Sequence, residues 1–186
     1  MHSITTTQLY SEYSTTILRF LRKYTTESDS EDLLQSIFLK IAENLGGFKG
    51  ESSLKTWIFR IAVNSLKDLF KSKHHQVSAT TVSLDTLQVS TPSPGNGCSI
   101  EDSIDSNEMK KCIHEFIHRL PFNHSSILVL HEIEGFTIKD IAAIMNTSEG
   151  AMKVRLLRSR AKLRKLLNSA CTLSFDCSDK MLCERK

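Results

Sequence analysis

The chain has 186 residues, of which 40% are hydrophobic and 24% are charged, and its formal net charge is +3. This length suits one domain or two small domains with ordinary cores. No run approaches the ~20 apolar residues of a membrane span, and the N-terminus MHSITTTQLY lacks the basic and apolar regions of a signal peptide, so we expect a cytoplasmic protein with no membrane insertion.

Three amphipathic helices are predicted in residues 1–73. Apolar residues recur at helical spacing over residues 8–24, over a second segment that Asp29 is expected to cap, and over a third that begins at Ser52 or Ser53. Three helices of this length suffice for a small bundle, so residues 1–73 are expected to form one domain.

The third helix has two different sides. Trp57 lies on its apolar stripe and is expected in the core, whereas for Phe59 both a core position and a strand-separating role remain open. The polar side carries Lys55, Arg60, Asn64, Lys67 and Lys71. This side is therefore a basic face, suited to an anionic partner.

A flexible acidic linker is predicted over residues 74–107. Ser, Thr, Pro and Gly dominate there, as expected of a segment without its own core. No Lys or Arg occurs between Lys73 and Lys110, whereas several acidic residues do. The basic charge is therefore concentrated on both sides of an acidic middle, and local fields decide which partners approach.

Four further helices are predicted over residues 108–168. Pro121 separates the first two, and helical periodicity continues on both sides of it. Thr137 predicts the N-terminus of the third helix, which should end near Asn146, and Thr147 is expected to cap the fourth. The expected fold class is therefore all-α, with two small helical domains.

The last two of these helices have the pattern of a helix-turn-helix unit. The second helix has one apolar side, and seven basic residues occupy its other sides. These are Lys153, Arg155, Arg158, Arg160, Lys162, Arg164 and Lys165. Such a helix typically enters the DNA major groove. Basic amphipathic helices are also typical of solvated faces and of membrane-surface or calmodulin-binding segments, and this alternative stays open.

Two segments resemble a known family in the right order. The segment EDLLQSIFLKIAENLGGFKGESSLKTWIFRIAVN resembles region 2 of the extracytoplasmic-function sigma factors of bacterial RNA polymerase, within the sigma-70 family. The segment LPFNHSSILVLHEIEGFTIKDIAAIMNTSEGAMKVRLLRSRAKLRKLL resembles their region 4. The resemblance implies region 2 over residues 1–73 for core polymerase and minus-10 binding, and region 4 over residues 108–168 for minus-35 binding.

The resemblance also implies roles for single residues of region 2. Asp32 and Gln35 match positions at which the family docks on core polymerase. Asn64 matches the position that reads the minus-10 element as separated strands, where a side-chain amide offers donors and an acceptor to a base. The basic residues around it are expected to contact phosphates, namely Lys55, Arg60, Lys67 and Lys71.

The last helix of region 4 is the family's recognition helix. Arg155 and Arg158 are the best candidates for guanine edges of the minus-35 element, because arginine bonds guanine bidentately. Val154 stands where the family usually has a small polar residue, and it is expected to contact a thymine methyl. Other basic residues are expected at phosphates, namely Lys153, Arg160 and Lys162.

The C-terminal tail, residues 169–186, contains Cys171, Cys177 and Cys183, each six residues apart. Six residues turn a helix by ~240°, so the three thiols would not share one helical face. They would converge only if the tail folds around a soft metal ion or a disulfide, and free thiols are the alternative. Some sigma factors of this class carry cysteine-rich extensions that sense metals, and this tail is similar in kind. Promoter binding itself is expected to require no cofactor.

These observations together predict a sigma factor, a non-enzymatic subunit that binds core RNA polymerase and promoter DNA. An anti-sigma factor is a further candidate partner. The alternative is a stand-alone helix-turn-helix transcriptional regulator that binds duplex DNA as a dimer. An enzyme has little support, because the sequence shows no Ser/His/Asp set, nucleotide loop or catalytic metal pattern.

Overall fold

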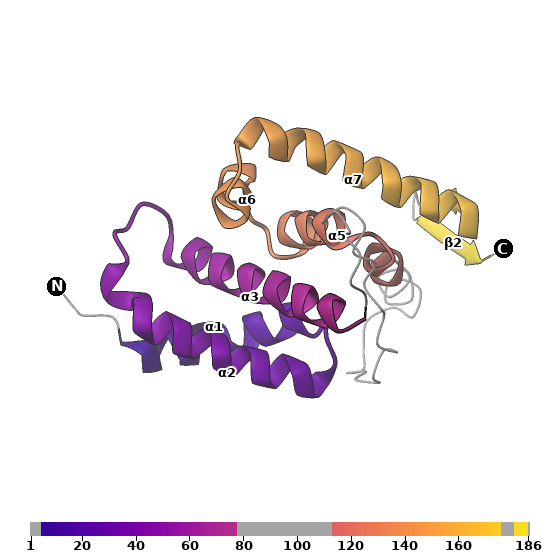
Figure 1. Cartoon of the computed structure of the whole chain (residues 1–186). Coiled ribbons are helices and arrows are strands. Elements are labelled where there is room, and N and C mark those ends of the chain that lie inside the picture. The colour runs from indigo at the N-terminus through magenta and orange to yellow at the C-terminus, as the bar shows by residue number, and fades with distance from the viewer. Residues whose placement is uncertain (1–4, 78–112, 176–180, 186) are drawn as a thin grey trace. The chain divides into compact units, whose positions relative to one another are not determined.

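The computed structural model describes residues 5–77, 113–175 and 181–185 (Figure 1). Helices dominate these ranges, which confirms the predicted all-α class. Contacts group the helices into two compact units. Most of the predicted acidic linker lies outside the described residues, so the predicted domain boundaries remain predictions.

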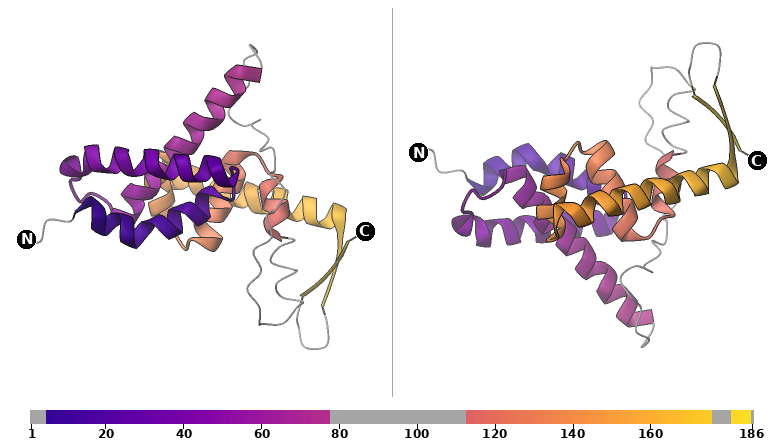
Figure 2. Two further views of the ribbon diagram at one scale, coloured as in Figure 1. Left: turned by 90° about the horizontal axis from the view of Figure 1, so that it is seen from below. Right: turned by 90° about the horizontal axis from the view of Figure 1, so that it is seen from above.

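The first unit contains the N-terminal helices together with one short helix from later in the chain. Its elements are α1 (Thr6–Leu21), α2 (Glu27–Asn44), the short 3-10 helix η1 (Leu45–Gly47), α3 (Leu54–Val77) and α6 (Ile138–Met145). Helices α1, α2 and α3 contact one another, and α6 packs against α3. The C-terminal half of α3 extends beyond α1 and α2 (Figure 2). The side chains buried most completely in this unit include Leu9, Ile17, Phe20, Leu21, Ile37, Ile41, Ile58, Phe59 and Leu66.

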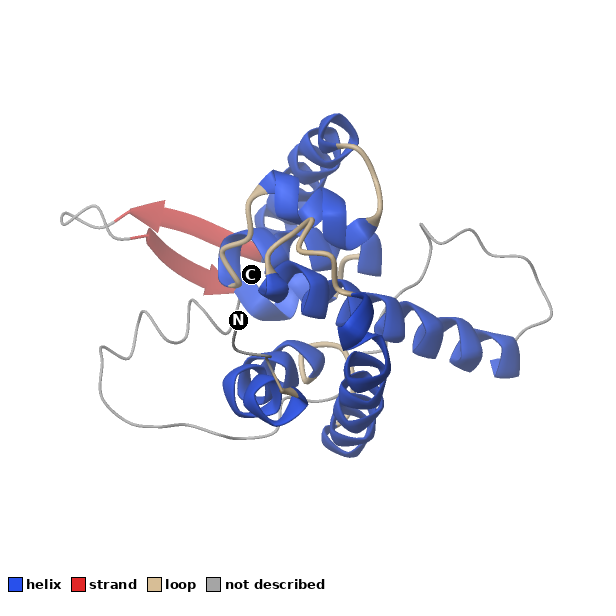
Figure 3. Cartoon of the chain, turned by 90° about the vertical axis from the view of Figure 1, so that its left-hand side faces the viewer, coloured by secondary structure: helices blue, strands red, loops and turns tan. Residues whose placement is uncertain are grey.

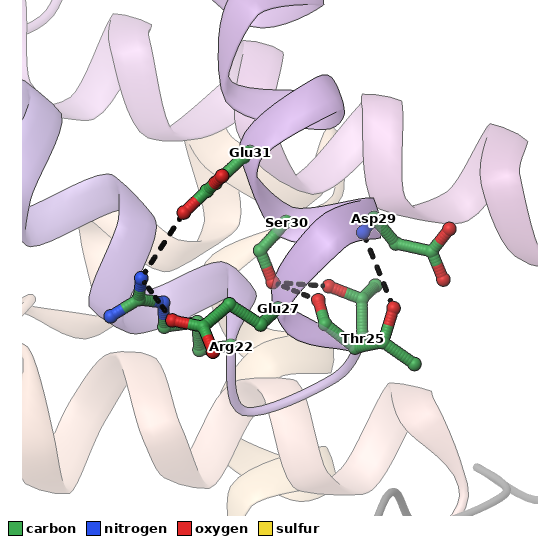
Figure 4. A network of polar contacts seen from close by, with 7 residues as sticks. Arg22, Thr25, Glu27, Asp29, Ser30 and Glu31 are labelled. Atoms are coloured by element: carbon green, nitrogen blue, oxygen red, sulfur yellow. Dashed lines mark hydrogen bonds and ion pairs between the residues drawn. The ribbon is translucent and has the colours of Figure 1, made fainter. Parts of the chain in front are cut away.

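The corner between α1 and α2 is fixed by polar contacts (Figure 4). Thr26 caps α2, and its Oγ1 accepts from the Asp29 N–H at 3.2 Å. The prediction that Asp29 itself is the cap was therefore wrong, because the helix begins one turn earlier. The hydroxyls of Thr25 and Ser30 lie 2.7 Å apart in the interior, where each buried polar atom needs a partner.

The same corner also carries exposed ion pairs. The Arg22 guanidinium lies 2.8 Å from the Glu27 carboxylate and 3.5 Å from that of Glu31 (Figure 4). Because these side chains are exposed, the pairs contribute little to stability. They link the end of α1 to the first turns of α2.

Helix α3 begins as the sequence predicted. The Ser53 hydroxyl accepts from the Thr56 N–H at 3.0 Å, so Ser53 is the cap. Trp57 is 7% exposed and Phe59 is fully buried, with its ring centroid 5.4 Å from that of Phe20 and 4.8 Å from that of Phe136. The open question about Phe59 is thus answered in favour of the core.

Helix α6 has caps at both ends. Thr137 and Asp140 form a capping box, as expected, and Asn146 ends the helix in the left-handed conformation with φ of 52°. The next helix is capped by Ser148, whose hydroxyl accepts from the Ala151 N–H at 3.2 Å. The prediction of Thr147 as this cap was wrong by one residue, because the left-handed Asn146 directs the Thr147 N–H back to α6.

The capping box gives a pH-dependent prediction. The Thr137 hydroxyl, helped by Thr56 at 3.0 Å, holds the pKa of the Asp140 carboxyl below its ordinary value of 3.8. Because this pKa is lower in the folded chain than in the unfolded chain, the ionised carboxylate stabilises the fold when the pH lies above the ordinary pKa. This stabilisation is lost as the pH falls through the folded pKa. Asp140→Asn should therefore cost about 1 kcal/mol at neutral pH and less at acidic pH, where the carboxyl is protonated in the folded chain, as measured by thermal melting. An equal cost at both pH values would contradict the prediction.

The second unit contains the remaining helices. Residues 113–118 are helical, and they are followed by α5 (Phe122–Leu128), the π-helical turn η3 (Val129–Ile133) and α7 (Glu149–Ala170), whose first turn belongs to the first unit. Its buried apolar side chains include Phe116, Ile117, Leu120, Phe122, Ile127, Leu130 and Leu156.

The π-helical turn was not expected from the sequence. The Glu134 N–H donates to the Val129 carbonyl at 3.0 Å, one residue further back than an α-helix allows. The wider turn rotates the residues that follow Leu130. Ile133, at the end of this turn, is 37% exposed although it lies three residues after the buried Leu130.

A short β-hairpin follows α7 in the tail, which the sequence analysis also missed. Strands β1 (Cys171–Phe175) and β2 (Met181–Arg185) pair antiparallel (Figure 3). In their register the Cα partner of Cys171 is Arg185, and that of Cys183 is Leu173.

Candidate nucleic-acid interface

The outer face of α3 presents the polar residues that the sequence singled out. Arg60, Asn64 and Lys71 are exposed, and Lys67 is half-buried. Lys55 differs from them, because its ammonium lies 4.6 Å from the centroid of the Phe136 ring in a cation-π contact. The structure therefore brings Arg60 and Asn64 together on one face and places Lys55 against Phe136, two residues before α6.

A pocket of about 310 Å³ opens beside Asn64, between α2 and α3. Its lining residues are Lys40, Asn44, Trp57, Arg60, Ile61, Asn64 and Ser65. The Lys40 ammonium donates to the Ser65 hydroxyl at 2.9 Å and so connects the two helices. Sequence reasoning did not find Lys40, Asn44 and Ser65. Lys40 and Asn44 are four residues apart on α2, and the lining residues of α3 follow one another at helical spacings, which is consistent with one shared face on each helix.

The chemistry of this pocket fits a flat heteroaromatic ring. Trp57 and Ile61 supply apolar surface, whereas Arg60 and Asn64 supply donors and an acceptor at the rim. Aromatic and apolar side chains stack on any base, and rim hydrogen bonds distinguish one base edge from another. Trp57 is only 7% exposed, so the accessible part of this hollow is mainly its polar rim, and base binding there remains a prediction.

The outer face of α2 carries a different group of residues. Asp32 and Gln35 are exposed, as a docking role requires. Leu39, which sequence reasoning missed, is 66% exposed and lies on the same face, since the three positions are spaced by three and four residues. A single exposed apolar side chain is ordinary on a protein surface, so the docking role of this face remains a prediction.

Helix α7 has one buried side and one exposed side. Met152, Leu156 and Ser159 are buried. Lys153, Val154, Leu157 and Arg158 are exposed, whereas Arg155 is half-buried. Leu157 was not singled out from the sequence, yet it is 70% exposed beside Arg158. The exposed surface of the first turns therefore combines two cations with two apolar side chains.

Two of the predicted phosphate contacts on α7 have partners within the chain. Arg160 donates through Nε and Nη2 to Oε1 of Glu132, at 3.0 and 2.6 Å. The Lys162 ammonium lies 2.8 Å from Nε2 of His124. Neither contact was predicted, because Glu132 and His124 are 28 and 38 residues away in the sequence.

The cysteines of the tail lie in the hairpin and in the segment that joins its strands. Cys171 lies in β1 and Cys183 in β2, whereas Cys177 lies outside the described residues. No group of three or more metal-ligating side chains occurs among the residues that the structure describes. The metal site at these cysteines stays a prediction. In the same ranges, no helix has both the length and the apolar character needed to cross a membrane.

Two family models match separate parts of the chain. The model of Sigma-70 region 2 matches residues 9–76, and that of Sigma-70, region 4 matches residues 110–163. The first match covers α3 and the outer face of α2, and the second covers α6 and most of α7. Each match therefore contains one of the exposed basic helices described above.

Curated relatives are similar along most of their length. The chain is 28% identical to the ECF RNA polymerase sigma-E factor of Haemophilus influenzae, over 82% of each chain. It is 27% identical to the RNA polymerase sigma-H factor of Pseudomonas aeruginosa, over 86% of this chain and 84% of the relative.

Solved structures share the fold. The sigma factor RpoE from Bartonella quintana, in complex with the anti-sigma factor NepR, has a TM-score of 0.67 at 23% identity, and the match covers 87% of this chain and 96% of that one. CnrH, in complex with the cytosolic domain of CnrY, has a TM-score of 0.61 at 21% identity, with 88% of each chain covered.

Proposed function

Because this chain belongs to the sigma-70 family of sigma factors, we propose that it binds core RNA polymerase and directs it to promoters with a minus-10 and a minus-35 element. The observation that carries the proposal is the pairing of two surfaces in one chain. One is the base-sized pocket beside Asn64 on α3, and the other is the exposed basic side of α7. A sigma factor needs both, because it reads two separate promoter elements.

The pocket between α2 and α3 is assigned to the minus-10 element. We propose that one base of the separated strands enters it, stacks on the apolar wall and is read by Asn64 and Arg60. Lys67 and Lys71 lie further along α3 and would contact the phosphates that follow. Lys55 is assigned to the packing of α6 rather than to DNA, because of its contact with Phe136.

The exposed side of α7 is assigned to the minus-35 element. Arg158 would bond a guanine bidentately, and Lys153 would contact a phosphate. Val154 and Leu157 would contact thymine methyl groups, since apolar side chains favour that group in the major groove. Half-buried Arg155 is a second candidate for a base edge.

The outer face of α2 is assigned to core polymerase through Asp32, Gln35 and Leu39. The protein would then be a non-enzymatic specificity subunit that acts in the cytoplasm. An anti-sigma factor is a further proposed partner, and the complex of RpoE with NepR supports this because the fold is shared.

Titration of the pure chain with core polymerase and promoter DNA tests the proposal. Specific initiation should require both proteins together. Tight binding to duplex DNA at physiological salt without polymerase would instead support the alternative, a stand-alone helix-turn-helix regulator.

The tail is proposed to be dispensable for polymerase binding. Deletion of residues 171–186 removes the β-hairpin and three cysteines but none of the surfaces assigned above. The affinity for core polymerase should change less than about twofold, which lies within the spread of neutral surface changes. If the cysteines hold a soft metal ion, the deletion should abolish stoichiometric zinc in the purified protein, as measured by metal analysis. A truncated chain that no longer binds polymerase would show that the tail is structural.

A further inference from the structure

The contact between Arg160 and Glu132 joins α7 to the π-helical turn. Two nitrogens of the guanidinium donate to one carboxylate oxygen, at 3.0 and 2.6 Å. Glu132 lies within this π-turn, where the bond from Glu134 to Val129 spans one residue more than an α-helical bond. The extra residue rotates Glu132 relative to α5. An α-helical turn would aim this carboxylate elsewhere.

A second contact joins α7 to α5 through the buried imidazole of His124. The Ser159 hydroxyl donates to the Arg155 carbonyl at 2.8 Å and can therefore accept from Nδ1–H of His124, which is also 2.8 Å away. This assigns the proton to Nδ1, so Nε2 carries a lone pair. The Lys162 ammonium, 2.8 Å from Nε2, donates to that lone pair. Both ring nitrogens are then satisfied by α7.

We propose that Glu132 and His124 are positioning residues for minus-35 recognition, which hold α7 through Arg160 and Lys162 at a fixed rotation and tilt. The inference rests on the proposed function of α7. It assigns the two cations to the placement of the helix instead of to DNA phosphates. The residues assigned to base contacts, Leu157 and Arg158, lie within one turn of Arg160 on the same helix. A rotation of α7 at its contacts with Glu132 and His124 therefore moves their side chains along the DNA major groove.

The two roles for Arg160 predict opposite results for Glu132→Gln. If Glu132 positions α7, the variant should lose discrimination between minus-35 sequences, because the base-facing side chains are no longer held in register. If Arg160 instead contacts a phosphate, removal of the competing carboxylate frees the cation. DNA binding should then become tighter without loss of discrimination between minus-35 sequences. Its salt dependence should be steeper by about one counterion.

The experiment uses holoenzyme reconstituted from the full chain and core polymerase, on a library of duplexes with randomised minus-35 and minus-10 segments. Sequencing of the transcribed templates gives the preferred promoter. Initiation is then measured on that promoter and on its single-base minus-35 variants. A wild-type protein that enriches no sequence would refute the proposed function itself. Enrichment by the wild type makes the comparison of variants interpretable.

The expected result for Glu132→Gln is a loss of at least about fivefold in minus-35 discrimination. Misplaced contacts should cost about as much binding free energy as one mismatched base pair. The pair is exposed, with side chains 52% and 45% accessible, so melting should shift by less than about 5 °C. His124→Phe keeps the volume but removes both bonds, and it should reduce discrimination in the same way. Arg164→Gln, one turn beyond Arg160 on α7, is the matched control and should leave discrimination unchanged.

A charge swap makes the test decisive. The double variant Glu132→Arg and Arg160→Glu restores the ion pair with reversed charges, so it should recover most of the discrimination that each single variant loses. Under the phosphate role, Arg160→Glu places a negative charge beside DNA, and the swap should be no better than that single variant. Failure of the swap, unchanged discrimination in Glu132→Gln, or unfolding of that variant would each overturn the proposal.

Discussion

Replacement of Leu39 by aspartate is expected to lower the affinity of the chain for core RNA polymerase by about 30-fold or more without unfolding it. Leu39 lies on the exposed face of α2 with Asp32 and Gln35, and 66% of its surface is accessible. An apolar side chain that fills a pocket on a partner contributes about 2 kcal/mol or more at an interface, which corresponds to this factor. Aspartate additionally places a charge where water has been excluded.

The measurement is equilibrium binding of the labelled full chain to core polymerase without DNA, together with a melting curve for each variant. Leu157→Asp is the matched control, because Leu157 is 70% exposed on α7 and the substitution is the same. Its melting temperature and its affinity for polymerase should both stay near those of the wild type. Wild-type affinity of the Leu39 variant would show that α2 does not provide this docking surface.

Helical periodicity explains why most of the fold could be predicted. Residues such as Ile17, Phe38 and Ile41 recur at intervals that place them on one side of a helix, and the structure buries them. The caps were predicted less well. Ser53 and Thr137 were right, whereas Asp29 and Thr147 were displaced by Thr26 and Ser148. Neighbouring residues of similar chemistry compete for a cap, and the path of the preceding loop selects one of them.

The features that the sequence did not predict depend on contacts between distant residues. Lys40 and Arg60 meet at the pocket only because α2 and α3 pack side by side. Glu132 faces Arg160 from within a π-turn, across the 28 residues that separate the two in sequence. The exposure of Leu39 and Leu157 was also not predicted, because apolar residues in helices are ordinarily assigned to the core. Periodicity describes single helices, and it does not report which surfaces remain uncovered.

The largest effect on DNA reading is expected at Asn64. This side chain is exposed at the rim of the pocket, and its amide can bond a base edge only after the base has left the stack. Asn64→Ala should therefore weaken binding of single-stranded DNA that carries the preferred minus-10 segment by about 1–3 kcal/mol, or roughly 5- to 150-fold. Duplex binding by the free chain should not change, because the paired base cannot enter the pocket.

The pocket supplies its own spectroscopic probe for this prediction. Trp57 is the single tryptophan of the chain and lines the pocket wall. A base that stacks there should change its fluorescence, so titration of the full chain with single-stranded oligonucleotides reports occupancy directly. Lys71→Ala is the comparison variant, because Lys71 lies further along the exposed side of α3 and is assigned to a phosphate. It should weaken binding of all sequences equally and reduce the salt slope by about one. If Asn64→Ala also weakens all sequences equally, then Asn64 contacts the backbone, and the base is read by another side chain of the pocket.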